Sequence, residues 1–166
     1  LGQITVQLLA GTHTVLFYGD YEFDLNGTFN EFATVNGAPG AGESYKVSNS
    51  SFGLGLFNEF SAANLDNTNL VSSGSAPGDD VAVAMGWVNF SVPTGFQADF
   101  LFKVLDTQPV SGFYIEQTDI DSGEKIYFTQ SVTLTSVSTV PEPGYHLVIL
   151  AMGGGIFALR RLRSKA

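Results

Sequence analysis

The chain has 166 residues, of which 44% are hydrophobic and 13% aromatic, so it can build one core and is not a disordered sequence. Its 16 acidic residues against seven basic ones argue against binding to the phosphates of nucleic acids. The absence of cysteine excludes disulfides, thiolate metal sites and a cysteine nucleophile. The charge is uneven, because all acidic residues lie between Asp20 and Glu142, while basic residues gather near the C-terminus. We interpret the acidic body as a soluble extracellular domain.

Short runs of β-favouring residues, separated by Gly, Asn and Ser, follow one another along residues 1–139. In the clearest run Phe96, Phe100 and Val104 share one face of a strand, while Asp99 and Lys103 share the other. The expected strands are Gln3–Leu9, Thr14–Tyr18, Tyr21–Phe29, Tyr45–Val47, Phe52–Phe57, Val81–Val92, Phe96–Leu105, Phe113–Ile120 and Ile126–Val137.

Turn signals lie between these runs, among them Asn26-Gly27, Pro93-Thr94-Gly95 and Asp121-Ser122-Gly123. Only Asn58–Leu65 resembles one or two turns of helix before the C-terminal segment. Short strands with frequent turns predict an all-β domain over residues 1–139, an antiparallel β-sandwich with a jelly-roll-like topology.

Histidine is scarce, since His13 and His146 are the only two in the chain. A Ser-His-Asp triad would have to use His13, and no Gly-x-Ser-x-Gly motif is present. A glycosidase with paired carboxylates is the remaining enzymatic alternative, but Asp20, Glu22 and Asp24 alternate along one polar strand face. A general acid needs a buried carboxyl with a raised pKa. We therefore expect that the protein is not an enzyme.

Two ligand hypotheses follow from side-chain chemistry. Asp119, Asp121 and Glu124 surround the turn glycine Gly123, and calcium prefers such oxygen ligands, although the twelve-residue EF-hand pattern is absent. The alternative is that these are solvated turn residues, and no other cofactor is expected. Aromatic residues could form a carbohydrate-binding platform, with an ordinary sandwich core as the alternative. The candidates for this platform are Trp87, Tyr114 and Tyr127.

The C-terminal segment has three parts. Residues 140–144 contain two prolines and form a linker, and residues 145–159 are apolar apart from His146. As a helix over residues 145–162, with Arg160 and Arg161 reaching toward the interface, this part would span roughly 27 Å, against a bilayer hydrocarbon thickness of about 30 Å, so we expect a transmembrane helix. Residues 163–166 form a basic tail. The cations expected to stay in the cytoplasm, which places the body in the periplasm, are Arg160, Arg161, Arg163 and Lys165.

Small residues in this apolar stretch recur at a spacing that allows another helix to approach closely. Ala151 with Gly155, and Gly154 with Ala158, form two such pairs. The expected partners are therefore the lipid bilayer and other transmembrane subunits.

Pro141-Glu142-Pro143, the apolar stretch and the Arg160-Arg161 cluster together resemble the PEP-CTERM sorting signal of Gram-negative bacteria. The resemblance covers Val140 to Ala166 only. It implies recognition by an exosortase, cleavage near Pro-Glu-Pro, and export to the cell surface, often in bacteria that make exopolysaccharide. The globular regions of that family vary widely, so the resemblance implies a route and no activity.

Two functions remain open at this point. The first is a single-pass inner-membrane protein, a structural or accessory subunit of a bacterial membrane or envelope complex, with photosynthetic and respiratory complexes as candidate hosts. The second is an exosortase-sorted cell-surface or matrix protein that binds glycans. Residue 1 is leucine, as expected for a chain processed during export.

Overall fold

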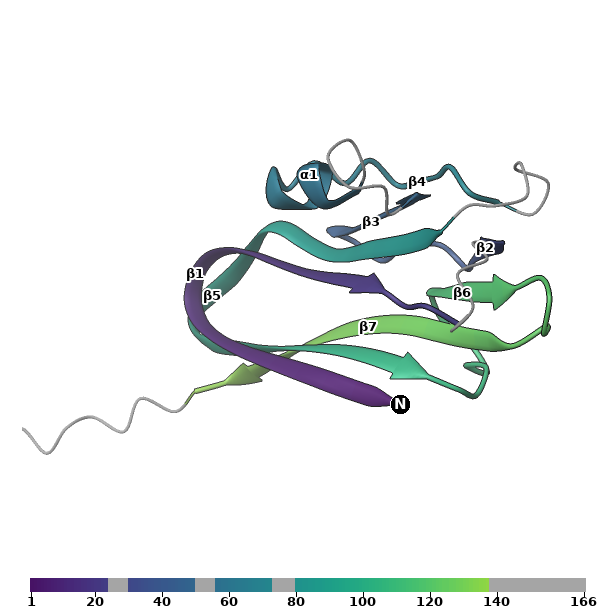
Figure 1. The fold of residues 1–166 in the computed structure, drawn as a ribbon. Helices are drawn as coiled ribbons and strands as arrows, with labels where there is room; N and C mark the ends of the chain where they lie inside the picture. Colours follow the sequence, from purple (N-terminus) through teal and green to yellow (C-terminus); the bar gives the residue numbers. More distant parts are fainter. Residues whose placement is uncertain (24–29, 50–55, 73–79, 138–166) are drawn as a thin grey trace, which may run out of the picture. The chain divides into compact units, whose positions relative to one another are not determined.

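The computed structural model describes residues 1–23, 30–49, 56–72 and 80–137 (Figure 1). Within them the chain is mostly β-strand with one short helix, which confirms the expected all-β class. The elements are β1 (Gly2–Asp20), β2 (Glu31–Asn36), β3 (Glu43–Asn49), α1 (Leu56–Ser61), β4 (Thr68–Asn69), β5 (Val81–Leu105), β6 (Tyr114–Asp119) and β7 (Lys125–Ser136).

One sheet contains all the strands, in the order β2-β6-β7-β5-β3-β4, with β1 paired to β5. The pairs are antiparallel except for the parallel pair of β3 and β4. The first half of β5 pairs with β3 and the second half with β7, while β1 follows β5 through both halves. Figure 1 shows β1 and β5 curving together at one end, so that the sheet folds over into two layers.

The folded sheet nearly closes along one side, where β2 meets the segment that contains β4. The backbone N–H of Ala33 donates to the carbonyl of Val71 at 2.9 Å, and the side-chain amide of Asn69 donates to the carbonyl of Ala33 at 2.8 Å. On the other side, β1 has no strand neighbour besides β5 within the described residues. This strand therefore forms the edge of both layers.

Aromatic and aliphatic side chains from both layers fill the interior. Trp87 and Phe100 are fully buried, with ring centroids 5.2 Å apart. Phe17 of β1 stacks on Phe102 of β5, with ring centroids 5.7 Å apart, and also contacts Phe128 of β7. Full burial of side chains of this size stabilises a fold by about 1.5–3 kcal/mol each, so this cluster holds the layers together.

At the bend, strands that the sequence predicts as separate are continuous, and one predicted turn is absent. Pro93-Thr94-Gly95 lies inside the continuous 25-residue strand β5, and β1 is likewise one strand of 19 residues. The register jumps from Leu9 opposite Gln97 to Gly11 opposite Val92, so β5 carries the extra residues at the bend. A bulge of this kind bends a ladder without ending it, and Gly95 there has a φ of +82°.

Other elements differ from the prediction more locally. The sequence does not predict β2 or β4. It predicts a strand over Tyr21–Phe29, but residues 21–23 are not in a strand, and residues 24–29 lie outside the described ones. It also predicts a strand over Phe52–Phe57, yet Leu56 and Phe57 begin α1. This helix packs Leu56 against Ala82 and Ala84 on the outer face of β5.

Residues 1–136 form one compact unit, and β7 ends at its last residue. The predicted linker, transmembrane helix and basic tail lie outside the described residues. In the part of the chain that the structure describes, no helix is long and apolar enough to cross a bilayer.

Candidate functional site

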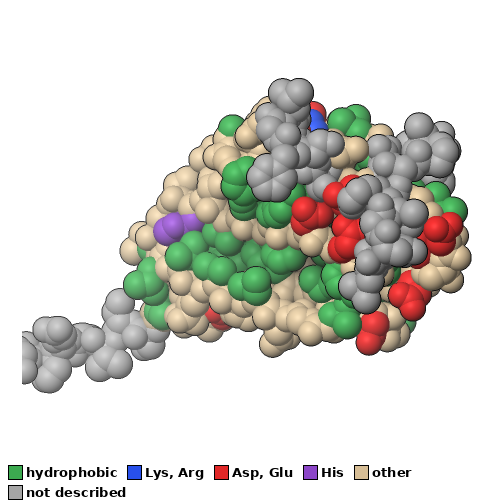
Figure 2. All heavy atoms as spheres, viewed as in Figure 1, with side chains coloured by type: hydrophobic (Ala, Val, Ile, Leu, Met, Phe, Trp, Pro, Cys, Tyr) green, Lys and Arg blue, Asp and Glu red, His purple; other side chains and the backbone are tan. Residues whose placement is uncertain are grey.

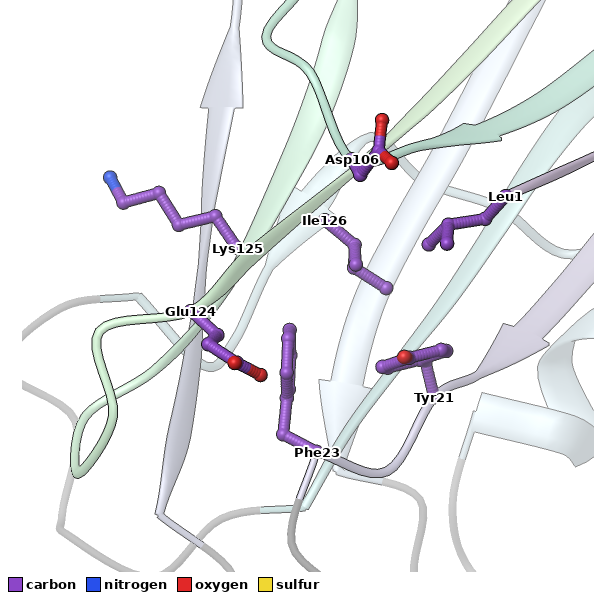
Figure 3. Close-up of a pocket in the computed structure, with 7 residues that line it drawn as sticks. All are labelled: Leu1, Tyr21, Phe23, Asp106, Glu124, Lys125 and Ile126. Carbon is purple, nitrogen blue, oxygen red and sulfur yellow. The ribbon is translucent and has the colours of Figure 1, made fainter.

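A cavity of about 290 Å³ lies where the chain leaves β1 and enters β7 (Figure 3). Its aromatic members are Tyr21 and Phe23, whose rings meet edge to face with centroids 5.0 Å apart. The full lining is Leu1, Tyr21, Phe23, Asp106, Glu124, Lys125 and Ile126. The lining of the cavity thus combines aromatic and aliphatic side chains with three charged ones.

Two of the three charged residues that line the cavity are acidic, and the third, Lys125, is already paired. Lys125 Nζ forms an ion pair with Glu116 at 2.6 Å, and Figure 3 shows its side chain pointing away from the aromatic pair. The carboxylate of Glu124 lies beside the Phe23 ring in the same view. Tyr21 is 38% exposed, so part of its ring is open to a ligand.

A buried polar network holds the two aromatic residues in place. The side-chain amide of Gln117 donates to the carbonyl of Tyr21 at 2.8 Å, and the N–H of Phe23 donates to Glu31 Oε1 at 3.4 Å. Glu31 Oε2 accepts from the N–H of Val81 at 3.3 Å and from the Gln117 amide. One carboxylate therefore connects the end of β1 with the start of β5 and with β6.

Glu31 is one of two carboxylates that are buried among the described residues, and only 5% of it is exposed. Burial raises the pKa of Glu31 to about 7, and the three hydrogen bonds offset only part of this effect. Its partner Gln117 is fully buried, and the amide oxygen of Gln117 has no hydrogen-bond partner among the residues that the structure describes. This pair was not identified from the sequence, where a lone Glu in a short strand carries no signal of burial.

Further acidic residues lie near the same end of β1. Burial and the neighbouring Asp80 raise the pKa of Asp20, although a hydrogen bond from the Tyr18 hydroxyl lowers it. Burial, together with Asp20, raises the pKa of Tyr18 to about 12. Figure 2 shows acidic side chains gathered at one end of the molecule, away from the single coloured histidine, His13.

The three proposed calcium ligands have different environments. Asp119 is 1% exposed, and its carboxylate accepts hydrogen bonds from the N–H of Asp121 at 3.1 Å, from the N–H of Ser122 at 2.8 Å and from the Ser122 hydroxyl. Asp121 and Glu124 are exposed, and Glu124 lines the cavity. Among the described residues, no group of three or more His, Asp or Glu side chains is placed to hold a metal ion. The Asp119 carboxylate is thus engaged in organising its own turn.

The three aromatic residues considered for a carbohydrate platform belong to the core. Trp87 is fully buried, and Tyr114 and Tyr127 are each 7% exposed. The exposed aromatic residue that lines the cavity is Tyr21, for which the sequence predicts a strand position. His13 lies on β1, with its ring nitrogen Nε2 2.7 Å from the carbonyl of Leu9 at the bend.

No protein-family model, curated protein or solved structure matches the chain. A functional proposal therefore depends on the cavity, on the edge of the sheet and on the sequence of residues 140–166.

Proposed function

We propose that this chain is a non-enzymatic β domain that is exported, sorted to the bacterial cell surface through residues 140–166, and binds neutral polysaccharide at the cavity beside Tyr21. The observation that carries the proposal is the series Pro141-Glu142-Pro143, an apolar stretch and an arginine cluster, in the order and spacing of an exosortase signal. The non-enzymatic part rests on two observations. The chain has no cysteine and two histidines, and Glu31, the buried carboxyl with a raised pKa, is bonded to Gln117 and to the backbone of Phe23 and Val81 and does not line the cavity.

The position of the domain boundary supports this route. The compact unit ends at Ser136, just before the Pro-Glu-Pro motif. Cleavage near Glu142 would leave every strand of the sheet in the released domain. Among the described residues, the buried core ends with Phe128, ahead of the sorting motif in the sequence.

The cavity supports a carbohydrate ligand by its chemistry. A sugar ring presents a face of C–H groups, which packs on an aromatic ring such as Tyr21, and hydroxyl groups, which donate to carboxylates. Asp106 and Glu124 supply such acceptors in the lining of the cavity. The same carboxylates would repel an anionic polymer, so the proposed ligand is a neutral polysaccharide.

Binding of dextran and of alginate by the purified protein tests the ligand. Tyr21→Ala should weaken dextran binding by at least about tenfold, because the open ring is lost. Phe57→Ala is the matched control, since Phe57 is an aromatic residue that is 58% exposed on α1, away from the cavity lining. Equal binding by both variants, or preference for alginate, would refute the carbohydrate site.

The small-residue pairs Ala151/Gly155 and Gly154/Ala158 favour a second candidate, a subunit that keeps its helix and packs it on neighbouring spans. The intact mass of the protein from native cells separates the two. A C-terminus near Glu142 supports surface sorting, whereas a C-terminus at Ala166 in a detergent-stable complex supports the retained subunit.

A further inference from the structure

β1 is a long edge strand with one side unpaired. Its 19 residues pair with β5 alone among the described elements. The N–H and C=O groups that point away from β5 therefore have no strand to bond with in the part of the chain that the structure describes. Such an edge is a template for another strand.

This edge lacks the features by which proteins usually protect an edge strand. Such features include charged side chains, proline and short length. Between Gly2 and Gly19 there is no Asp, Glu, Lys, Arg or Pro, in a chain that has 23 charged residues elsewhere, 16 acidic and seven basic. The register is irregular only between Leu9 and Gly11 and between His13 and Val15, so Gly2–Leu9 is an uninterrupted run of eight paired residues.

The same run carries exposed apolar side chains. Ile4 is 53% exposed and Leu9 is 64% exposed, and Val6 and Leu8 only partly enter the core. In Figure 2, a band of hydrophobic side chains crosses the visible face toward the end where the acidic side chains gather. Pairing along this edge would remove apolar surface from water as well as satisfy backbone groups.

We propose that Gly2–Leu9 pairs in antiparallel fashion with the same run of a second copy of this chain, so that the sheet continues across a twofold axis. Charge favours a second copy as the partner. The chain has a net charge of −9, so two copies repel over most of their surfaces, and this run is a neutral surface at which they can meet. A strongly charged partner would find no complementary charge along it.

The apolar pattern also selects the register. With Val6 on the twofold axis, Ile4 of one copy faces Leu8 of the other, Val6 faces Val6, and Thr5 faces Gln7. On one face of the new pair the apolar side chains of Ile4, Val6 and Leu8 then meet one another, and on the other face Thr5 meets Gln7 while Leu9 lies opposite Gln3. A shift by one residue would place side chains of different character opposite each other.

The test uses the full chain in mild detergent, with mass measured by sedimentation. Wild type should be dimeric, and Thr5→Lys should be monomeric, because it places like charges close together across the axis. Thr133→Lys on β7 is the matched control, since Thr133 is also an exposed strand residue, and it should stay dimeric. Gly154→Leu together with Gly155→Leu should also stay dimeric, which separates this contact from one made by the apolar segment.

Cross-linking tests the register directly. The chain has no cysteine, so Val6→Cys introduces the only thiol. On oxidation it should give a covalent dimer, and Thr133→Cys should not. A monomeric wild type at the highest soluble concentration overturns the proposal, and so does a dimer that survives Thr5→Lys. A dimer without the Val6→Cys cross-link overturns the register.

Discussion

The buried carboxylate of Glu31 accepts a hydrogen bond from the side-chain amide of Gln117, and the two side chains together fix the backbone of Tyr21 and Phe23. The position of the aromatic pair in the cavity therefore depends on a group whose pKa is raised by burial to about 7. Glu31, which holds the proposed ligand site in place, therefore changes its charge near neutral pH.

Stability should fall as the pH rises from 5 to 8. The pKa of Glu31 is raised from an ordinary value of 4.5 to about 7 in the folded protein, so folding favours the protonated form. The stabilising effect of the proton is fully present below pH 4.5 and is lost as the pH rises through 7, and it amounts to roughly 3 kcal/mol. Urea denaturation at pH 5, 6.5 and 8 measures this slope.

The matched variant for this prediction is Glu31→Gln, which cannot ionise. It should be less stable than wild type at pH 5 by about 1–3 kcal/mol, because both Glu31 oxygens accept hydrogen bonds and the amide nitrogen that replaces one of them cannot, whereas a protonated carboxyl oxygen still can. Its stability should depend much less on pH between 5 and 8. A slope as steep as that of wild type would show that another group is responsible.

Gly86 should not tolerate a side chain. Its φ is +152°, and a Cβ atom there would lie 2.1 Å from the carbonyl oxygen of Val15 on β1. Gly86→Ala should therefore separate β1 from β5 and cost more than about 3 kcal/mol of stability. Gly95→Ala is the comparison, since a Cβ at Gly95 meets no atom within 4 Å, and only the φ of +82° opposes it, at about 1 kcal/mol. Equal losses in thermal melts would contradict this account.

Asp119 should stabilise its turn without a metal ion. Hydrogen bonding from the Ser122 hydroxyl, which outweighs burial, lowers the pKa of Asp119 from 3.8. Its contribution is therefore present at neutral pH and is lost in acid, and Asp119→Ala should cost about 1–2 kcal/mol at pH 7. The melting temperature should be the same in calcium and in EDTA. A rise with calcium in wild type that Asp119→Ala abolishes would support the calcium site predicted from the sequence.

Lys46 should be more important for stability than an ordinary surface lysine. It is 5% exposed, and its Nζ lies 2.9 Å from a carboxylate oxygen of both Glu59 on α1 and Asp66. Lys46→Ala should cost about 2 kcal/mol, because the two carboxylates lose a shared partner, while Glu59→Gln should cost less than ~1 kcal/mol, because Asp66 remains. Denaturation midpoints of the two variants measure this, and an equal loss in both would contradict the shared role.

The sequence predicted the strands wherever alternation was strong. Phe96–Leu105 lies within β5, and Ile126–Val137 matches β7 closely. It failed at the bend, because proline and glycine at 93–95 also mark turns, and only the partner strand β1 shows that pairing continues. Local patterns cannot distinguish a turn from a bulge in a long ladder.

The buried polar network around Glu31 could not be predicted from the sequence, for a different reason. Glu31 precedes Phe32, Ala33 and Val35, a run too short to display a clear period, so its strand was missed. The network brings together Glu31, Gln117 and Tyr21, whose positions depend on how β2 and β6 pair. The cavity could not be predicted for the same reason, since residues within 1–23 and 106–126, which line it, are distant in the sequence and meet only in the folded sheet.

The pairing of β1 with β5 also has a kinetic consequence. Residues 2–20 find their partners only among residues 82–104, so no strand neighbour exists for β1 until most of the domain has been synthesised. Contacts this distant along the chain slow folding. For a protein that must cross a membrane unfolded, such a delay would help to keep the chain in a translocatable state until it reaches the far side.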